Sequence, residues 1–169
     1  MKTIQDHPKW VLLIPIFLIV ILDATLTLYG QSIQYWLTEY SEVNEASKNF
    51  KALLSISPYA FVFGVASWIV TLAVILKLST RNLALFITVV VCLCHSSAAS
   101  TWIMGSGFPF NYQLMIIVNI LQGSILSLAL ISYTNNVKKT DNNMSISPIV
   151  KAAIFALLIL SLYIFLAPE

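Results

Sequence analysis

Five stretches of about twenty apolar residues constrain this chain more than any other feature of its 169 residues. An α-helix rises about 1.5 Å per residue, so about 20 residues cross the hydrocarbon core of a bilayer. Inside hydrocarbon a backbone must satisfy its own polar groups, and a helix does so within one segment. We therefore predict an all-α polytopic membrane helix bundle with five transmembrane helices, at about 10–30, 58–78, 83–104, 112–133 and 149–167.

The composition agrees with a membrane protein and excludes one class of partner. Hydrophobic residues make up 59% of the chain and charged residues only 9%, whereas soluble domains carry about 25% charged residues. The net charge is +2, and no basic stripe alternates with aromatic residues, so we expect no nucleic-acid partner. Because we find no repeat and no second domain, residues 1–169 are predicted to form a single bundle in the lipid bilayer.

The distribution of positive charge predicts the orientation of the bundle. Lysine and arginine are retained on the cytoplasmic side of bacterial and other membranes. With the N-terminus inside, seven of the nine basic residues fall on the cytoplasmic side, and only Lys48 and Lys51 fall outside. The first stretch exceeds the roughly 7–15 residues of a signal-peptide core, so we expect it to be retained. The prediction is N-in and C-out, with the long connection 31–57 as an outer loop.

Asp23 is an ionisable residue inside the first apolar stretch. Such residues are costly in hydrocarbon and normally face a bundle interior or a wet cavity, with a partner. At about 1.5 Å per residue, Asp23 lies roughly 10 Å below the outer end of its helix. Ser67, His95 and Asn119 lie at similar depths in three other stretches. The orientation therefore predicts one polar layer in the outer leaflet.

Helical spacing extends this layer toward the outer loop. Thr27 and Gln31 follow Asp23 at intervals of four residues, which places all three on one face of the helix. We predict that Asp23 and His95 form a buried hydrogen-bonded pair with Ser67 and Asn119 nearby. The pair is either ionised or neutral with one shared proton.

Several functions are compatible with this layer. The polar residues join the helices, as polar residues in membrane bundles often do, or they form a proton or ion path. Asp23 and His95 could also serve as two ligands of a metal site, with Glu42 or Glu45 of the outer loop as a further ligand. The sequence contains no motif with metal-ligand spacing that identifies a metal. An intramembrane hydrolase is disfavoured, since no nucleophile elbow accompanies His95 and no second carboxylate faces Asp23. The sequence identifies no cofactor.

The acidic part of the outer loop has two interpretations of its own. Glu42, Asn44 and Glu45 have the chemistry to bind a cation or a partner. Alternatively they form a solvated helix cap beside the lipid headgroups, because Ser, Asn and acidic residues are common at helix starts. The aromatic residues Tyr35 and Trp36, earlier in the loop, are typical of a membrane interface.

The stretch LDATLTLYGQSIQYW and the following EVNEAS resemble an uncharacterised family of small bacterial multi-helix membrane proteins. In the family pattern an Asp and a Thr close the first helix and a Glu-x-Asn motif follows, which correspond here to Asp23, Thr27, Glu42 and Asn44. Glu45 stands where the family has a proline. The resemblance covers about a third of the chain, implies a bacterial inner-membrane location and supplies no activity.

These observations favour a small integral membrane subunit or accessory protein of a larger membrane complex, without catalysis of its own. The expected partners are other membrane protein subunits. The alternative is a transporter or membrane enzyme that binds an ion, a metal or a small ligand in an outer-facing cavity. Its candidate binding residues are Asp23, Thr27, Ser67, His95, Asn119, Glu42 and Glu45.

Overall fold

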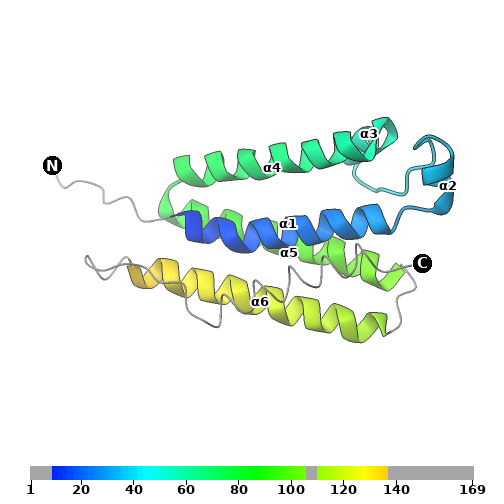
Figure 1. Cartoon of the computed structure of the whole chain (residues 1–169). Helices are drawn as coiled ribbons and strands as arrows, with labels where there is room; N and C mark the ends of the chain where they lie inside the picture. Colours follow the sequence, from blue (N-terminus) through cyan, green and yellow to red (C-terminus); the bar gives the residue numbers. More distant parts are fainter. Residues whose placement is uncertain (1–8, 106–109, 137–169) are drawn as a thin grey trace.

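The described part of the chain, residues 9–105 and 110–136, is a bundle of helices without β-strands (Figure 1). The structure is a computed structural model. Its helices, in chain order, are α1 (Trp10–Tyr29), α2 (Ile33–Leu37), α3 (Lys48–Ile56), α4 (Pro58–Leu78), α5 (Arg81–Gly105) and α6 (Asn111–Asn136).

Four of these helices, α1, α4, α5 and α6, are long and apolar enough to cross a membrane. They coincide with four of the five stretches found in the sequence and differ from the predicted ends by at most three residues. The all-helical class is thus confirmed for the described residues, and four of the predicted stretches are helices of the length and apolar composition that a span requires. The fifth predicted helix, 149–167, lies outside the described residues.

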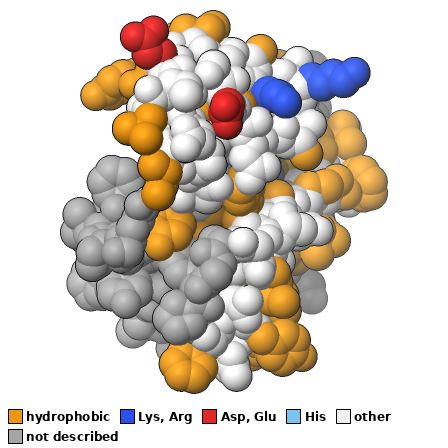
Figure 2. Space-filling view, turned by 90° about the vertical axis from the view of Figure 1, so that its right-hand side faces the viewer, with side chains coloured by type: hydrophobic (Ala, Val, Ile, Leu, Met, Phe, Trp, Pro, Cys, Tyr) orange, Lys and Arg blue, Asp and Glu red, His pale blue; other side chains and the backbone are white. Residues whose placement is uncertain are grey.

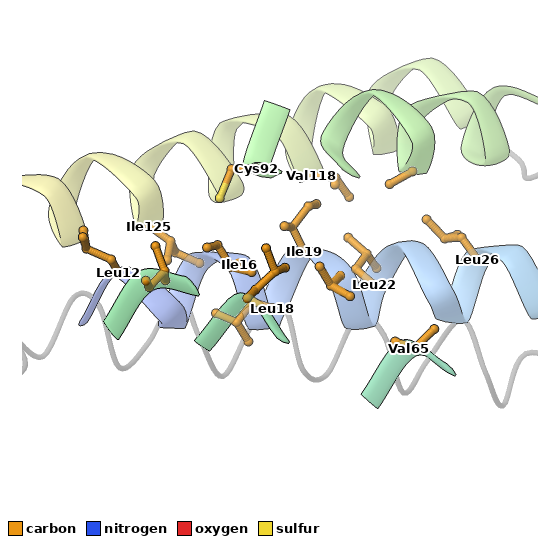
Figure 3. Packing of buried hydrophobic residues seen from close by; sticks show 14 of the residues in the cluster. Leu12, Ile16, Leu18, Ile19, Leu22, Leu26, Val65, Cys92, Val118 and Ile125 are labelled. Carbon is orange, nitrogen blue, oxygen red and sulfur yellow. The ribbon is translucent and has the colours of Figure 1, made fainter. Parts of the chain in front are cut away.

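Helix α1 occupies the centre of the described bundle. It packs against α4, α5 and α6, and 56% of its most apolar window is buried, compared with 22% in each of the other three spans. Leu12, Ile16, Ile19 and Leu22 contribute to a core shared with Cys92 of α5 and Ile125 of α6 (Figure 3). Asp23 therefore lies in the helix that contacts the other three long helices among the described residues.

One end of the bundle carries the link between α4 and α5. The sequence predicted a four-residue link, 79–82, but α5 already begins at Arg81, so the link is Ser79 and Thr80 only. The Lys9 ammonium donates to the carbonyl oxygens of Lys77 (2.9 Å) and Ser79 (2.6 Å). A cation at these carbonyls is favourable because the C-terminal end of a helix carries partial negative charge.

The opposite end, called here the α2–α3 end, holds the segment that the sequence assigned to an outer loop. The structure corrects that assignment, because 31–57 contains two short helices. A helix start near the acidic residues was one of the two interpretations of that part of the segment, but the extent of α3 was not predicted. Its signal was an amphipathic pattern, with Phe50, Leu53 and Leu54 on one face.

Tyr35 joins α2 to α3 and is fully buried, so it is a core residue and not an interfacial aromatic residue. Its hydroxyl donates to the carbonyl oxygen of Leu54 at 3.1 Å. The helical donor for that carbonyl would be the N–H of residue 58, which is a proline and has none. Trp36 is 45% exposed, consistent with the position at an interface that was predicted for it.

Candidate functional site

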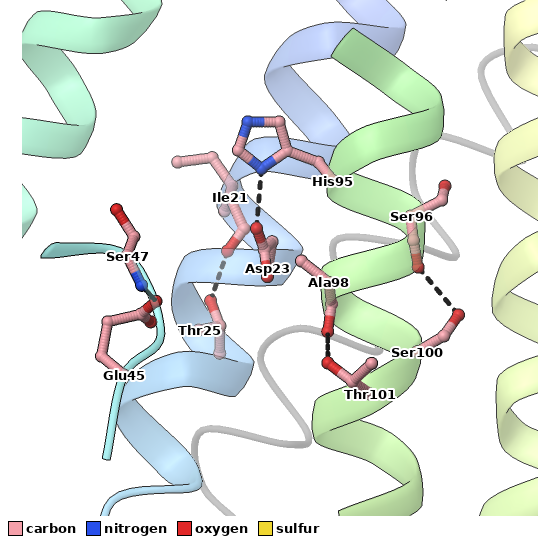
Figure 4. A network of polar contacts seen from close by, with 10 residues as sticks. All are labelled: Ile21, Asp23, Thr25, Glu45, Ser47, His95, Ser96, Ala98, Ser100 and Thr101. Atoms are coloured by element: carbon pink, nitrogen blue, oxygen red, sulfur yellow. Dashed lines mark hydrogen bonds and ion pairs between the residues drawn. The ribbon is translucent and has the colours of Figure 1, made fainter. Parts of the chain in front are cut away.

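Asp23 of α1 and His95 of α5 form the hydrogen-bonded pair that the sequence predicted (Figure 4). The distance from Asp23 Oδ2 to His95 Nδ1 is 2.7 Å. The side chains are mostly buried, with 13% of Asp23 and 18% of His95 exposed. The pair joins the two helices at a point where a small part of each side chain remains accessible.

The second carboxylate oxygen of Asp23 distinguishes this pair from a contact between helices in which every polar atom has a hydrogen-bond partner. Asp23 Oδ1 is buried and has no hydrogen-bond partner among the described residues. A buried acceptor without a donor costs about 1–3 kcal/mol. Such a group in a native structure therefore indicates a strained or functional position, or a donor supplied by a bound molecule.

A cavity of about 260 Å³ lies beside the pair. Asp23, Thr27 and His95 line it together with residues of the segment before α3, including Glu45 and Ser47. Most of the remaining lining is apolar, and it includes three aromatic side chains, from Phe50, Phe61 and Trp102. The cavity thus combines a few polar groups with apolar walls, which is the usual composition of small-ligand sites.

Gln31 fixes the segment that brings Glu45 to the cavity. Its buried side-chain amide donates from Nε2 to the carbonyl oxygens of Thr27 (2.8 Å) and Asn44 (2.9 Å). Its Oε1 accepts from the Asn44 backbone N–H at 2.9 Å. Gln31 thus pairs with the backbone of Asn44 as a neighbouring strand would. Glu45 is the next residue, and its carboxylate accepts from the Ser47 N–H (2.7 Å; Figure 4).

A tight turn after α2 directs the chain back toward α1. Glu39 and Tyr40 have φ angles of 51° and 68°, a left-handed conformation that costs a residue with a Cβ roughly 1–2 kcal/mol. The Tyr40 N–H donates to the Tyr35 carbonyl oxygen (3.0 Å), and the two rings are 5.2 Å apart. Burial raises the pKa of the Tyr35 hydroxyl above its ordinary value, and nearby Tyr40 adds to the effect.

Three of the residues proposed from the sequence lie outside the cavity. Ser67 is exposed on α4 and donates to the Phe63 carbonyl oxygen of its own helix at 2.9 Å. Asn119 is exposed on α6 and donates to Ser100 Oγ at 3.0 Å. Glu42 is exposed and does not line the cavity. Neither Ser67 nor Asn119 lines the cavity with Asp23 and His95, so the structure does not bring these two predicted residues to the site.

The aromatic wall of the cavity was missed by sequence reasoning. Trp102 packs against Gly30, where a Cβ would overlap its ring, and Phe50 and Phe61 meet nearly edge to face, with centroids 5.6 Å apart. The sequence contained one signal, since Trp102 shares the helical stripe of His95. Cys94, an exposed thiol, also lines the cavity.

The site does not have the composition of a metal centre. Within residues 9–105 and 110–136, no group of three His, Cys, Asp or Glu side chains lies close enough together to hold a metal ion. Asp23 and His95 offer two ligands, and protein metal sites need three or four. The metal site weighed from the sequence therefore has no support in the described geometry.

Comparison of the chain with protein-family models, curated proteins and solved structures found no match.

Proposed function

We propose that this chain is an integral membrane protein that binds a small polar ligand in the cavity beside Asp23 and His95. The observation that carries the proposal is the meeting of the Asp23–His95 pair and Glu45 at one cavity of about 260 Å³. A liquid water occupies about 30 Å³, so this space is large enough for a molecule of several non-hydrogen atoms. Asp23, His95 and Glu45 give the lining of this cavity its polar side chains.

The proposed orientation places this cavity toward the outside of the cell. Lys9, Lys77 and Arg81 lie at the end of the bundle opposite α2 and α3, whereas Glu39 and Glu45 belong to the α2–α3 end. By the positive-inside rule the first end is cytoplasmic. We propose five spans in total, N-in and C-out, with 149–167 as the fifth. The resemblance to small bacterial membrane proteins supports a location in the bacterial inner membrane.

A second candidate function is that of a non-catalytic subunit in a membrane complex. The exposed amide of Asn119 supports it, because polar side chains in membrane helices normally face protein or a wet cavity. Ser67 does not carry the same information, since it bonds its own backbone and is compatible with lipid. The two functions are compatible, since a subunit can also bind a ligand.

Native mass spectrometry of the gently solubilised protein tests the first proposal. We expect a small-molecule adduct on the wild-type chain that is lost in Asp23→Asn, which keeps the size of the side chain and removes its charge. Ser67→Ala, at a similar depth but outside the cavity, is the matched control and should keep the adduct. An adduct that persists in Asp23→Asn, or a wild-type protein without one, would refute the ligand site. A stable larger assembly of both the wild-type protein and Asp23→Asn would support the subunit function.

A further inference from the structure

We infer that the ligand of the cavity is a small organic cation that carries an ammonium group. This inference rests on the proposed function, namely that the cavity is an accessible binding site, and adds the chemical class of its occupant. Two features of the lining support it: the net charge and the aromatic wall.

The first feature is the net charge of the cavity wall. The hydrogen bond between Asp23 Oδ2 and His95 Nδ1 holds one proton. If Asp23 Oδ1 carries no proton, the charge of the pair depends on His95 Nε2. The pair has a charge of −1 when Nε2 is unprotonated and 0 when Nε2 is protonated. Ionised Glu45 adds a further −1. Because no lysine or arginine is among the described residues that line the cavity, the described wall is negative in both states.

Basic residues are nevertheless close to this end of the bundle. Figure 2 shows acidic and basic side chains together on the α2–α3 end. Lys48 and Lys51 are exposed on α3 and belong to the outer surface, not to the cavity wall. Exposed charges are screened by salt over about 10 Å, so they weaken the negative potential in the cavity less than a lining lysine would.

The second feature is the aromatic wall. Phe50 and Phe61 present rings at an angle of 74° to one another, and Trp102 lines the same space. Aromatic faces attract ammonium ions within about 6 Å of the ring centroid, and such faces recognise quaternary ammonium ligands. A metal ion would instead require additional oxygen or nitrogen ligands, and a neutral apolar ligand would leave the carboxylates without a counter-charge.

The buried Asp23 Oδ1 lacks a donor among the described residues and has almost no accessible surface. It therefore adds to the negative charge beside the cavity without contacting the ligand directly. A free organic amine and an ammonium-bearing lipid headgroup share this chemistry. The test below separates these two sources.

Cys94 is a natural reporter of the charge preference, because it lines the cavity and is exposed. Its sulfur attacks a methanethiosulfonate reagent, an S–S bond forms, and methanesulfinate leaves. The rates of a trimethylammonium-ethyl reagent and of a sulfonatoethyl reagent are each divided by their rates with a free thiol in solution. Buried Cys92 is the internal control, and mass spectrometry identifies the labelled residue.

We expect the cationic reagent to label Cys94 faster than the anionic one in wild-type protein, after this normalisation. A charge about 8 Å from the reagent, at a dielectric constant of about 20 to 80, changes the local reagent concentration about two- to thirtyfold. Glu45→Gln should reduce the rate ratio by about the square of this factor, because the charge that concentrates the cationic reagent depletes the anionic one to the same extent. Glu42→Gln, which removes the same charge from an exposed position in the same segment, should leave it close to the wild-type value.

Tetramethylammonium and the choice of lipid distinguish the two sources of the ligand. A site for free amines predicts that tetramethylammonium chloride, but not sodium chloride at equal ionic strength, slows labelling in phosphatidylglycerol nanodiscs. A headgroup site predicts slower labelling in phosphatidylcholine nanodiscs without any added amine. Either result supports an organic cation.

Two outcomes would overturn the proposals separately. Equal normalised rates for the two reagents on wild-type Cys94 would refute the cation, while leaving an accessible cavity. Protection of native Cys94 from both reagents, with full labelling after unfolding, would refute the accessible site itself. The wild-type ratio requires no variant, so the test does not depend on whether Glu45→Gln folds.

Discussion

Truncation of Gln31 should release the segment that carries Glu45. Gln31→Ala removes the two hydrogen bonds that join its side chain to the Asn44 backbone, both 2.9 Å long, and the bond to the Thr27 carbonyl oxygen. A hydrogen bond contributes about 1 kcal/mol net, so the two bonds to Asn44 hold the segment by about 2 kcal/mol. Since 1.4 kcal/mol corresponds to a factor of ten, the segment should open about thirtyfold more often.

Hydrogen exchange measured by mass spectrometry in nanodiscs reads out this opening. The Asn44 amide donates to Gln31 Oε1 in the wild-type protein, so a peptide that covers 41–47 should exchange about thirtyfold faster in Gln31→Ala if opening limits exchange. Peptides from the centre of α1 should be unaffected. Gln34→Ala is the matched control, because Gln34 is an exposed glutamine only three positions along the chain.

Gln31→Glu refines the test. It keeps the shape of the side chain and the acceptor for the Asn44 N–H, but it places an oxygen opposite the carbonyl oxygens of Thr27 and Asn44. It should therefore exchange faster than wild type despite its equal size. If residues 41–47 of Gln31→Ala exchange at the same rate as in the wild-type protein, the reasoning is refuted. That result would show that the turn after α2 holds Glu45 in place without Gln31.

Further predictions concern glycines and Tyr35. Gly30→Ala should lower the free energy of unfolding by about 1–3 kcal/mol, because its Cβ meets the Trp102 ring. In Gly64→Ala the new Cβ meets the flexible end of the Leu53 side chain, so the free energy of unfolding should change by less than about 1 kcal/mol. In Gly123→Ala the new Cβ enters open space, so the free energy of unfolding should rise by up to about 1 kcal/mol. Thermal unfolding ranks the three, and a Gly123→Ala protein less stable than Gly30→Ala would contradict the packing argument. Tyr35→Phe should cost about 1–3 kcal/mol, because the Leu54 carbonyl oxygen loses its donor. Burial raises the pKa of the Tyr35 hydroxyl in the folded state. The protonated hydroxyl therefore contributes fully to stability below the ordinary pKa of about 10, and this contribution is lost as the pH rises through the raised pKa. Unfolding measured between pH 9 and 12 should show this loss in wild type, and an equally steep loss in Tyr35→Phe would assign it to another group.

The sequence by itself determined the helical class and four of the spans. Long apolar stretches have few structural solutions in hydrocarbon, because every backbone N–H and C=O must be satisfied within the segment. The ends of α1 and α4 were predictable for local reasons. Gly30 follows the first apolar stretch, and Ser57 accepts from the Ala60 N–H while Pro58 occupies the first helical position.

The Asp23–His95 contact was also predictable, because the cost of an ionisable group in hydrocarbon favours a partner at the same depth. Depth alone did not identify the other members of the site. Ser67 and Asn119 satisfy the same depth criterion, but the rotation of α4 and α6 turns them away from the cavity. Rotation about a helix axis is set by packing between helices, and α4 and α6 have only weak sequence asymmetry to indicate it.

The tertiary structure alone decided which outer residues meet Asp23. Of the two glutamates considered, Glu45 reaches the cavity and Glu42 does not, since Gln31 pairs with the Asn44 backbone and fixes the register of that segment. The aromatic wall likewise combines Trp102 of α5 with Phe50 of α3 and Phe61 of α4. Contacts between residues so distant in the chain depend on how separate helices pack, and local sequence patterns do not encode that packing.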